Sequence, residues 1–202
     1  MKQASIFTIL FCLIPAASLL AQYTVYGAIG DKYNAMLTSN ASKGIYIGKP
    51  ISNELSTSDR TGRYQKFAGY DIYWHPLTGA REIHGPIRDR FIATGAENGF
   101  GYPVTDITWC RDRIGKYMHF RSFKNPQHPA ASSIYWSPQT NAVEVYGAIG
   151  EKYQSIGGAG SNLGYPVAAE YQDGRNRTQR FQHGTITWNA TYGARVNGPA
   201  TY

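Results

Sequence analysis

The sequence predicts a mainly β protein with short helices, built from three copies of one structural unit. A tetrapeptide recurs as Tyr26-Gly27-Ala28-Ile29, His84-Gly85-Pro86-Ile87 and Tyr146-Gly147-Ala148-Ile149, with a partial copy from Asn197. The same order of features follows each full copy, and each copy ends in the two-residue alternation typical of strands. We therefore expect pseudo-symmetric units at about 26–83, 84–145 and 146–202.

Each unit is expected to open with a short helix. After the glycine of the first unit, Ile29, Tyr33 and Met36 stand at positions i, i+4 and i+7, and the later units repeat this spacing. The spacing places the three side chains on one face of a helix. Pro86 stands near the start of the second helix, where its missing N–H removes no helical hydrogen bond.

A Gly-x-Pro turn and a β-hairpin are expected to follow the helix. The hairpins contain Gly69 and Gly184 between runs of alternating residues. The second hairpin carries extra polar and proline residues between Arg121 and Ser132, which indicates an inserted loop. Residues present in every unit are expected to serve its fold: Gly48, Gly101, Gly164, Pro50, Pro103, Pro166, Phe67, Phe120, Phe181, Trp74, Trp136 and Trp188.

One unit of this kind cannot bury its own apolar face, so the three are expected to share a core filled by the repeated aromatic residues. The two end segments, 23–27 and 194–198, occupy equivalent places in the repeat. This equivalence leads us to expect that the ends meet and close a ring, in a single domain that resembles a small propeller.

The repeat resembles the LGFP family, which is named after a Leu-Gly-Phe-Pro turn. The turn is present here as Phe100-Gly101-Tyr102-Pro103 and Leu163-Gly164-Tyr165-Pro166, whereas Ile47-Gly48-Lys49-Pro50 lacks the aromatic residue. The resemblance covers nearly all of residues 23–202. It implies an accessory repeat of the kind appended to secreted enzymes that modify cell walls, and here the repeats stand without room for a catalytic domain.

The first 21 residues are expected to form a secretory signal peptide, which leaves a single domain at 22–202. An apolar segment runs from Ile6 to Leu20 and is too short for a comfortable membrane span. Cys12 leaves with this segment, so Cys110 remains alone, either buried or paired with another chain, and burial is the commoner outcome. We expect a secreted protein, extracellular or associated with the cell wall.

The sequence contains no motif that favours catalysis. It has no Gly-x-Ser-x-Gly elbow, and its five histidines lack the spacing of a metalloprotease site. We expect no enzymatic activity, no metal site and no cofactor.

A net charge of +7 favours anionic partners. It is modest for a nucleic-acid-binding protein, and secretion argues against that partner, so we expect no nucleic acid. An anionic polysaccharide or another wall polymer fits better.

The candidate ligand-binding residues are aromatic or basic. Trp109 is not demanded by the repeat, and Tyr102 and Tyr165 lie at turns, where binding residues gather. Lys66, His119 and Arg180 share the strand face opposite the repeated phenylalanines, so they are expected to form a cationic row in solvent. Asn40, Asn176 and Asn189 lie in sequons that would carry glycans in a eukaryotic host.

These observations favour a secreted, non-enzymatic module that binds a cell-wall polymer or another glycan through three weak equivalent sites. One alternative is a small secreted hydrolase that acts on wall polysaccharide or peptidoglycan, with its site in the irregular second unit. Another alternative is a secreted protein-interaction module, which would present an exposed apolar patch.

Overall fold

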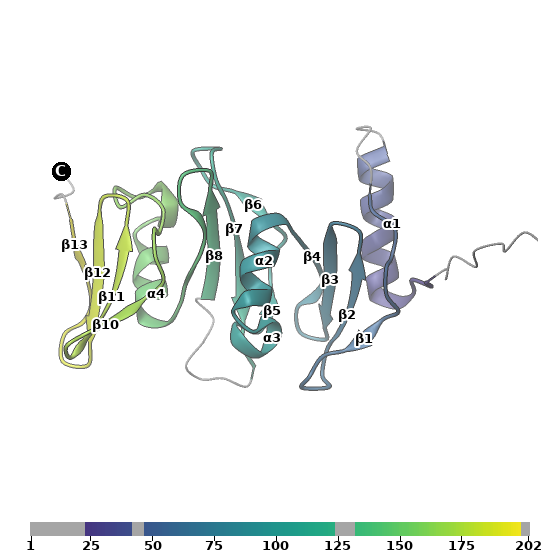
Figure 1. Cartoon of the computed structure of the whole chain (residues 1–202), viewed down its shortest axis with the longest axis horizontal. Coiled ribbons are helices and arrows are strands. Elements are labelled where there is room, and N and C mark those ends of the chain that lie inside the picture. Colours follow the sequence, from purple (N-terminus) through teal and green to yellow (C-terminus); the bar gives the residue numbers. More distant parts are fainter. Residues whose placement is uncertain (1–22, 42–46, 124–131, 199–202) are drawn as a thin grey trace, which may run out of the picture.

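The computed structural model describes residues 23–41, 47–123 and 132–198, which form three modules in an open row (Figure 1). Each module consists of a helix followed by an antiparallel sheet. Along the row, α1 is followed by the first sheet, then α2 and α3, the second sheet, α4 and η1, and the third sheet. The helices α2 and α4 are therefore enclosed between two sheets, whereas α1 and the third sheet are the outer layers.

The first module contains one helix and a four-stranded sheet with the order β1-β2-β3-β4. Its elements are α1 (Gly27–Ala41), β1 (Leu55–Ser56), β2 (Arg63–Phe67), β3 (Tyr70–His75) and β4 (Gly79–His84).

The second module repeats this plan, with the main strand order β5-β7-β8-β9 and the short β6 paired to β7. Its elements are α2 (Gly85–Ala93), α3 (Ala96–Gly99), β5 (Tyr102–Pro103), β6 (Thr108–Trp109), β7 (Lys116–Arg121), β8 (Ser132–Ser137) and β9 (Asn141–Val145).

The third module again has a four-stranded sheet, with the order β10-β11-β12-β13. Its elements are α4 (Gly147–Ser155), the 3-10 helix η1 (Gly158–Gly160), β10 (Tyr171–Asp173), β11 (Asn176–Phe181), β12 (Gly184–Asn189) and β13 (Gly193–Asn197).

The predicted helices and hairpins are confirmed. Strands β2 and β3, β7 and β8, and β11 and β12 pair in antiparallel fashion. Most of the loop predicted in the second hairpin, 124–131, lies outside the described residues. The edge strands β1, β6 and β10 are two or three residues long, and no periodicity in so short a segment predicted them.

The first helix is longer than the other two because it lacks their stop signal. Gly95 and Gly157 follow α2 and α4 with φ angles of 97° and 103°. A glycine in this left-handed conformation ends a helix at little steric cost. Leu37 stands at the equivalent position of α1, which continues to Ala41.

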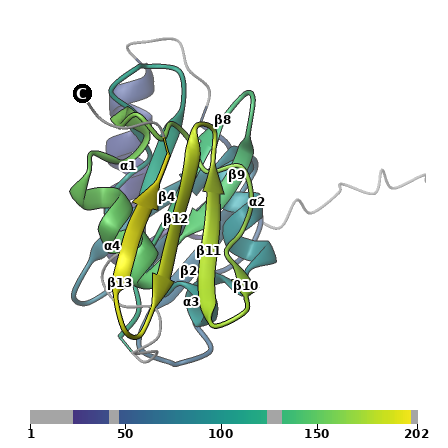
Figure 2. The ribbon, with the colours of Figure 1, turned by 90° about the vertical axis from the view of Figure 1, so that its left-hand side faces the viewer.

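The expected propeller-like closure is wrong. Each sheet is open, and the two end segments that were expected to meet lie at opposite ends of the row (Figure 1). Viewed along the row, the third sheet presents one face with no helix in front of it (Figure 2). The ring does not form because α2 and α4 each pack against the sheet before them as well as against their own, which continues the modules in a line.

The repeated phenylalanines occupy equivalent, buried positions. Phe67 stacks on Tyr33 of α1 with ring centroids 5.1 Å apart, and Phe120 stacks on Phe91 of α2 at 5.0 Å. Phe181 likewise contacts Tyr153 of α4. The three phenylalanines are at most 4% exposed, which confirms their structural role. Trp74, Trp136 and Trp188 are half-buried at the margins of the same clusters.

The Gly-x-Pro turns attach each module's helical part to its hairpin. Pro50, Pro103 and Pro166 are bridged to Phe67, Phe120 and Phe181, respectively. A Cβ atom on Gly48 would lie 1.9 Å from the Ala68 carbonyl oxygen, and one on Gly101 would lie 2.1 Å from that of Arg121. On Gly164 it would lie 2.5 Å from the Gln182 side chain. Glycine is therefore required for the close backbone approach in the first two modules, and the φ angle of 67° favours glycine at Gly164 in the third.

The predicted signal peptide, 1–21, lies outside the described residues. Within the described ranges, no helix is both long and apolar enough to cross a membrane.

Candidate functional site

Successive modules are joined by a tyrosine from the Gly-x-Pro turn. Tyr102 of the second module enters the turn between β1 and β2 of the first. Its hydroxyl donates a hydrogen bond to Asp59 Oδ1 at 2.6 Å and lies 2.8 Å from Thr57 Oγ1. Tyr102 is 2% exposed, so this hydrogen bond is shielded from water. We call this contact the first lock.

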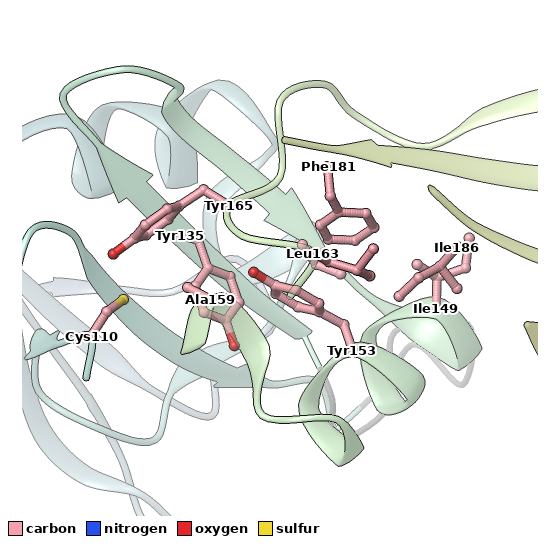
Figure 3. Close-up of a cluster of buried hydrophobic side chains, with 10 residues drawn as sticks. Cys110, Tyr135, Ile149, Tyr153, Ala159, Leu163, Tyr165, Phe181 and Ile186 are labelled. Carbon is pink, nitrogen blue, oxygen red and sulfur yellow. The ribbon is translucent and has the colours of Figure 1, made fainter. Parts of the chain in front are cut away.

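The same contact recurs between the second and third modules, as the second lock, whose tyrosine, Tyr165, is labelled in Figure 3. The Tyr165 hydroxyl donates to the Asp112 carboxylate at 2.8 Å and accepts the Gly115 N–H at 2.9 Å. Tyr165 is 4% exposed and points toward Cys110. Because Tyr165 comes from one module and Asp112 from the module before it, the contact fixes how the two modules meet.

Each lock needs a glycine at the end of the turn that receives the tyrosine. A Cβ atom on Gly62 would lie 2.4 Å from the Tyr102 ring, and one on Gly115 would lie 2.5 Å from the Tyr165 ring. Contacts this short are closer than the van der Waals separation of carbon atoms. The tyrosine ring therefore fills the space that any larger residue would need.

The first lock perturbs the ionisation of both of its partners. Burial alone would raise the pKa of Asp59, but hydrogen bonds from Tyr102, from Thr61 and from Thr57 hold that pKa well below its usual range. Burial, and then the hydrogen bond to Asp59, raise the pKa of Tyr102 to about 12. Burial is also the largest cause that raises the pKa of Tyr165. Asp59 is thus stabilised as a carboxylate and Tyr102 as a neutral hydroxyl.

A groove lies beside each lock, between a sheet and the helix that follows it. The first groove has a volume of about 420 Å³ and lies between the first sheet and α2 with α3. The second groove has a volume of about 530 Å³ and lies between the second sheet and α4 with η1. Matching positions line both, so they are two versions of one feature. The three modules therefore do not present three equivalent sites, because the third sheet has no helix after it within the described residues.

The second groove combines aromatic rings with polar groups. Tyr117 stacks on Tyr135 with ring centroids 5.5 Å apart, and the Tyr117 ring also lies 4.8 Å from that of His119. The opposite wall of the second groove is the glycine-rich segment 157–160. A Cβ atom on Gly158, whose φ is 59°, would lie 3.0 Å from the Tyr135 hydroxyl. The lining is completed by Trp109, Cys110, Arg111 and Gln154.

A hydrogen-bonded chain crosses the floor of the second groove. Gln154 of α4 donates to Ser133 Oγ at 2.9 Å, and His119 Nδ1 lies 2.7 Å from the same oxygen. Burial lowers the pKa of His119, which favours its neutral form at pH 7. This floor can therefore offer an uncharged imidazole and an amide to a ligand.

The first groove is bridged across its rim, whereas the second is not bridged in this way. The Ser58 N–H and hydroxyl both lie 3.1 Å from Glu97 Oε1, and the hydroxyl lies 2.6 Å from Asn98 Oδ1. We call this set of contacts the latch. The equivalent positions at the second groove hold Arg111, Ala159 and Gly160, where neither alanine nor glycine has a polar side chain.

Tyr102 and Tyr165 are not exposed at their turns, in contrast to our expectation. Both are buried in the locks, so neither ring is available to a ligand in this arrangement. The prediction failed because the turns themselves are covered by the preceding module. A loop residue is exposed only where nothing packs against the loop.

Lys66, His119 and Arg180 do share the face opposite the phenylalanines, but they do not form one row in solvent. Lys66 lines the first groove, His119 is half-buried in the second, and Arg180 lies exposed on the third sheet. Helices separate the three positions because the modules stack face to face. The expectation of a continuous cationic row is therefore wrong.

Trp109 lies at the rim of the second groove and is 55% exposed. The Lys116 ammonium lies 4.5 Å from the centre of its ring. Trp109 pairs with Lys116 across β6 and β7, and Lys116 shares its strand face with Phe120. Trp109 therefore lies at the sheet edge, where it is an exposed aromatic residue at the rim of the groove.

The remaining candidate residues have internal partners. Asn40 Nδ2 donates to the Met36 carbonyl within α1, and Asn189 Nδ2 donates to Asn176 Oδ1. Glycosylation at Asn189 would replace one hydrogen of this amide donor. Cys110 is buried, as expected, and burial raises the pKa of its thiol. A thiol held in its neutral form is a weak nucleophile.

The sequence contains a signal for the locks that the search for catalytic and binding motifs did not reveal. The receiving turns read Asp59-Arg60-Thr61-Gly62 and Asp112-Arg113-Ile114-Gly115, an Asp-Arg-x-Gly motif. The third module has Asp173-Gly174-Arg175-Asn176 in this turn, and no described tyrosine lock follows it. Among the described residues, the motif is therefore present where another module follows and is lost where none does.

Comparison with known families agrees with the repeat seen in the structure. The family model for the LGFP repeat matches residues 47–99, 100–161 and 163–200. These units begin at the Gly-x-Pro turn, whereas our units begin at the helix, so the same elements are divided at a different point. A search of curated proteins found no match.

Proposed function

Because the chain belongs to the LGFP repeat family, we propose that it is a secreted, non-enzymatic module that binds a cell-wall polymer or another glycan, and that the second groove is its main binding site. Secretion is supported by the apolar segment near the N-terminus, and the preference for an anionic polymer by the charge of +7. The experiment below tests the proposed partner.

The observation that carries this proposal is the difference between the two grooves. Glycans are bound by aromatic rings that cover the apolar face of a sugar, and by planar polar groups that meet its hydroxyls. The second groove places Tyr117 beside His119 and Gln154 in a space of about 530 Å³. That volume lies within the ordinary range for small-ligand sites of about 300–1,000 Å³.

The first groove has a similar shape but a less suitable lining. Its rim is bridged by the latch between Ser58, Glu97 and Asn98. A ligand that enters there must displace these hydrogen bonds and lie beside the carboxylate of Glu97. An anionic polymer is thereby disfavoured. Binding through two unequal grooves would still be multivalent, with the second groove dominant.

The proposal is tested by retention on insoluble wall polysaccharide. The chain without residues 1–21 is incubated with the polymer at low and high salt, and the bound fraction is measured. We expect retention of the native chain. The double variant Arg111→Ala, His119→Ala should bind about tenfold more weakly, a change of about 1.4 kcal/mol.

The matched control is Ser58→Ala, Lys66→Ala, which changes the equivalent positions of the first groove. It should retain nearly native binding, while thermal unfolding confirms that both variants fold. No retention of the native chain at either salt concentration would contradict the proposed function. Equal losses in both double variants would contradict the assignment to the second groove.

A further inference from the structure

The outward face of the third sheet differs from the equivalent faces of the other two sheets. We call this surface the terminal face. No helix covers it in the described structure (Figure 2). By strand alternation and register, its side chains come from every second residue of the sheet and include Tyr171, Thr178, Arg180, Thr187, Arg195 and Asn197.

The first two sheets use this face to receive the next helix, and the residues there are apolar and aromatic. Tyr64 stacks on Tyr73 with ring centroids 5.2 Å apart, and Tyr117 stacks on Tyr135 at 5.5 Å. Ile83 and Val145 are buried beside these pairs. Each stacked pair contacts a ring of the next helix, Phe91 in one case and Tyr153 in the other.

In the third sheet, threonine and asparagine stand at these positions. Thr178 occupies the position of Tyr64 and Tyr117, three residues before the repeated phenylalanine. Thr187 occupies the position of Tyr73 and Tyr135, directly before the repeated tryptophan. Their hydroxyl oxygens lie 3.2 Å apart, and Asn197 Nδ2 donates to Thr187 Oγ1 at 3.1 Å. These positions are therefore polar where the first two sheets have apolar and aromatic residues, with Thr178 only 4% exposed between its neighbours and Asn197 exposed.

The terminal face also carries an excess of positive charge, because its two arginines outnumber the one acid among its strand residues, Asp173, and it carries exposed rings. Arg180 and Arg195 lie on the two strands that flank β12, and in the described structure neither forms an ion pair with a carboxylate. The Arg195 guanidinium lies 4.6 Å from the centre of the Tyr192 ring, and Tyr192 is 62% exposed. Tyr171, at the other edge of the sheet, is 43% exposed.

We propose that the terminal face is a second binding surface, separate from the grooves, which takes an extended acidic polysaccharide. Hydroxyl and amide side chains repeat across the strands at the strand spacing of about 4.8 Å, comparable to the length of one sugar residue in an extended chain. Arg180 and Arg195 would meet carboxylate or phosphate groups of the polymer, and the rings at the two edges would cover sugar faces. The choice of a glycan as partner rests on the proposed function.

Other partners fit this surface less well. Nucleic acid binding depends on neutralising many closely spaced phosphates, which two arginines do not provide. Protein interfaces have a core enriched in aromatic residues, whereas the centre of the terminal face consists of threonine and asparagine. The acidic polysaccharide is therefore the partner whose charge and hydrogen-bonding groups match the face.

The inference is tested with soluble polygalacturonate as the acidic probe and dextran as the neutral one. The chain without residues 1–21 should bind polygalacturonate and not dextran, with an affinity that falls as salt rises. The double variant Arg180→Glu, Arg195→Glu should bind about tenfold more weakly. The control variant Lys49→Glu, Arg60→Glu makes the same change in net charge at exposed positions of the first module and should bind within twofold of the native chain.

Light scattering and the groove variant separate the possible outcomes. Absence of polygalacturonate binding, or an equal effect of the two charge-reversal variants, would overturn the inference. So would a dimer that dissociates in Arg180→Glu, Arg195→Glu, since a second copy would then cover the face. If Arg111→Ala, His119→Ala loses wall retention while the face variant still binds polygalacturonate, only this inference fails. If Arg111→Ala, His119→Ala is still retained on wall polysaccharide while the face variant no longer binds polygalacturonate, only the groove assignment fails.

Discussion

The two junctions between modules share one lock and differ in their grooves. Tyr102 and Tyr165 make the same hydrogen bonds to Asp59 and Asp112. Beside them, the first groove is bridged by Ser58, whereas the second has glycine and alanine where the latch residues would be. Stability and access to ligand are therefore controlled by different residues of one repeated unit, so that one junction can change its groove without losing its lock.

The largest expected effect tests whether the two locks are equivalent. Tyr102→Ala and Tyr165→Ala each remove a buried ring, and each should lower the free energy of unfolding by about 3–5 kcal/mol. Chemical denaturation measures this change. Tyr→Phe at the same positions keeps the ring and removes the hydroxyl, so it should cost about 1–3 kcal/mol. A large decrease in the free energy of unfolding at one junction and none at the other would show that the two locks do not stabilise the protein in the same way.

The next effect tests the latch. Glu97→Ala with Asn98→Gly gives the first groove the residues of the second and removes the acceptors of Ser58. We expect a loss of about 1–2 kcal/mol in the free energy of unfolding, because the contacts are exposed and one acceptor is charged. Ser58→Ala in this double variant should then have almost no further effect. A full additional loss would mean that Ser58 acts through other contacts.

A third prediction concerns pH at the second groove. Burial lowers the pKa of His119 in the folded state below the unfolded value of about 6.5. Its contribution to stability is complete above that value and is lost as the pH falls below it, since the unfolded chain binds the proton first. Thermal unfolding of His119→Gln between pH 7 and about pH 5 should show a weaker pH dependence than the native chain. The exposed His183 provides the control, and an unchanged pH dependence in His119→Gln would contradict the assignment.

The smallest effect concerns strain in the receiving turns. Arg60 and Arg113 have φ angles of 61° and 58°, whereas the corresponding turn of the third module uses Gly174 at 59°. Arg60→Gly and Arg113→Gly should each raise the free energy of unfolding by about 0.5 kcal/mol, because glycine adopts this conformation without steric cost. As a control, Arg175→Gly should not raise the free energy of unfolding. A lower free energy of unfolding in Arg60→Gly or Arg113→Gly would show that these arginines make stabilising contacts.

The elements of the modules could be predicted from the sequence, but their assembly could not. The spacing of Ile29, Tyr33 and Met36 identified a helix, and the alternation around Phe67 identified a strand. Whether modules close a ring or continue in a line depends on which face of each sheet receives a helix. That choice is made by residues such as Tyr73 and Ile83, which look like ordinary core residues in the sequence.

The candidate site was predicted only in part for the same reason. His119 and Trp109 do line the second groove. Trp109 was predicted because it falls outside the repeat, and His119 because it shares a strand position with Lys66 and Arg180. Tyr102 and Tyr165 were expected on exposed turns, yet they are buried by the module before them. Contacts between segments that lie 40 or more residues apart, such as Tyr102 with Asp59, leave no local pattern apart from a repeated motif.

The central claim is that the second groove is the main glycan-binding site and that the first groove binds more weakly. Amide chemical shifts of the folded chain, recorded while a soluble wall-glycan fragment is added, test this claim directly. We predict that the largest changes cluster at Tyr117, His119 and Gln154, with little change at the equivalent residues Tyr64, Lys66 and Ile92. Equal changes in both sets, or changes confined to the first set, would contradict it.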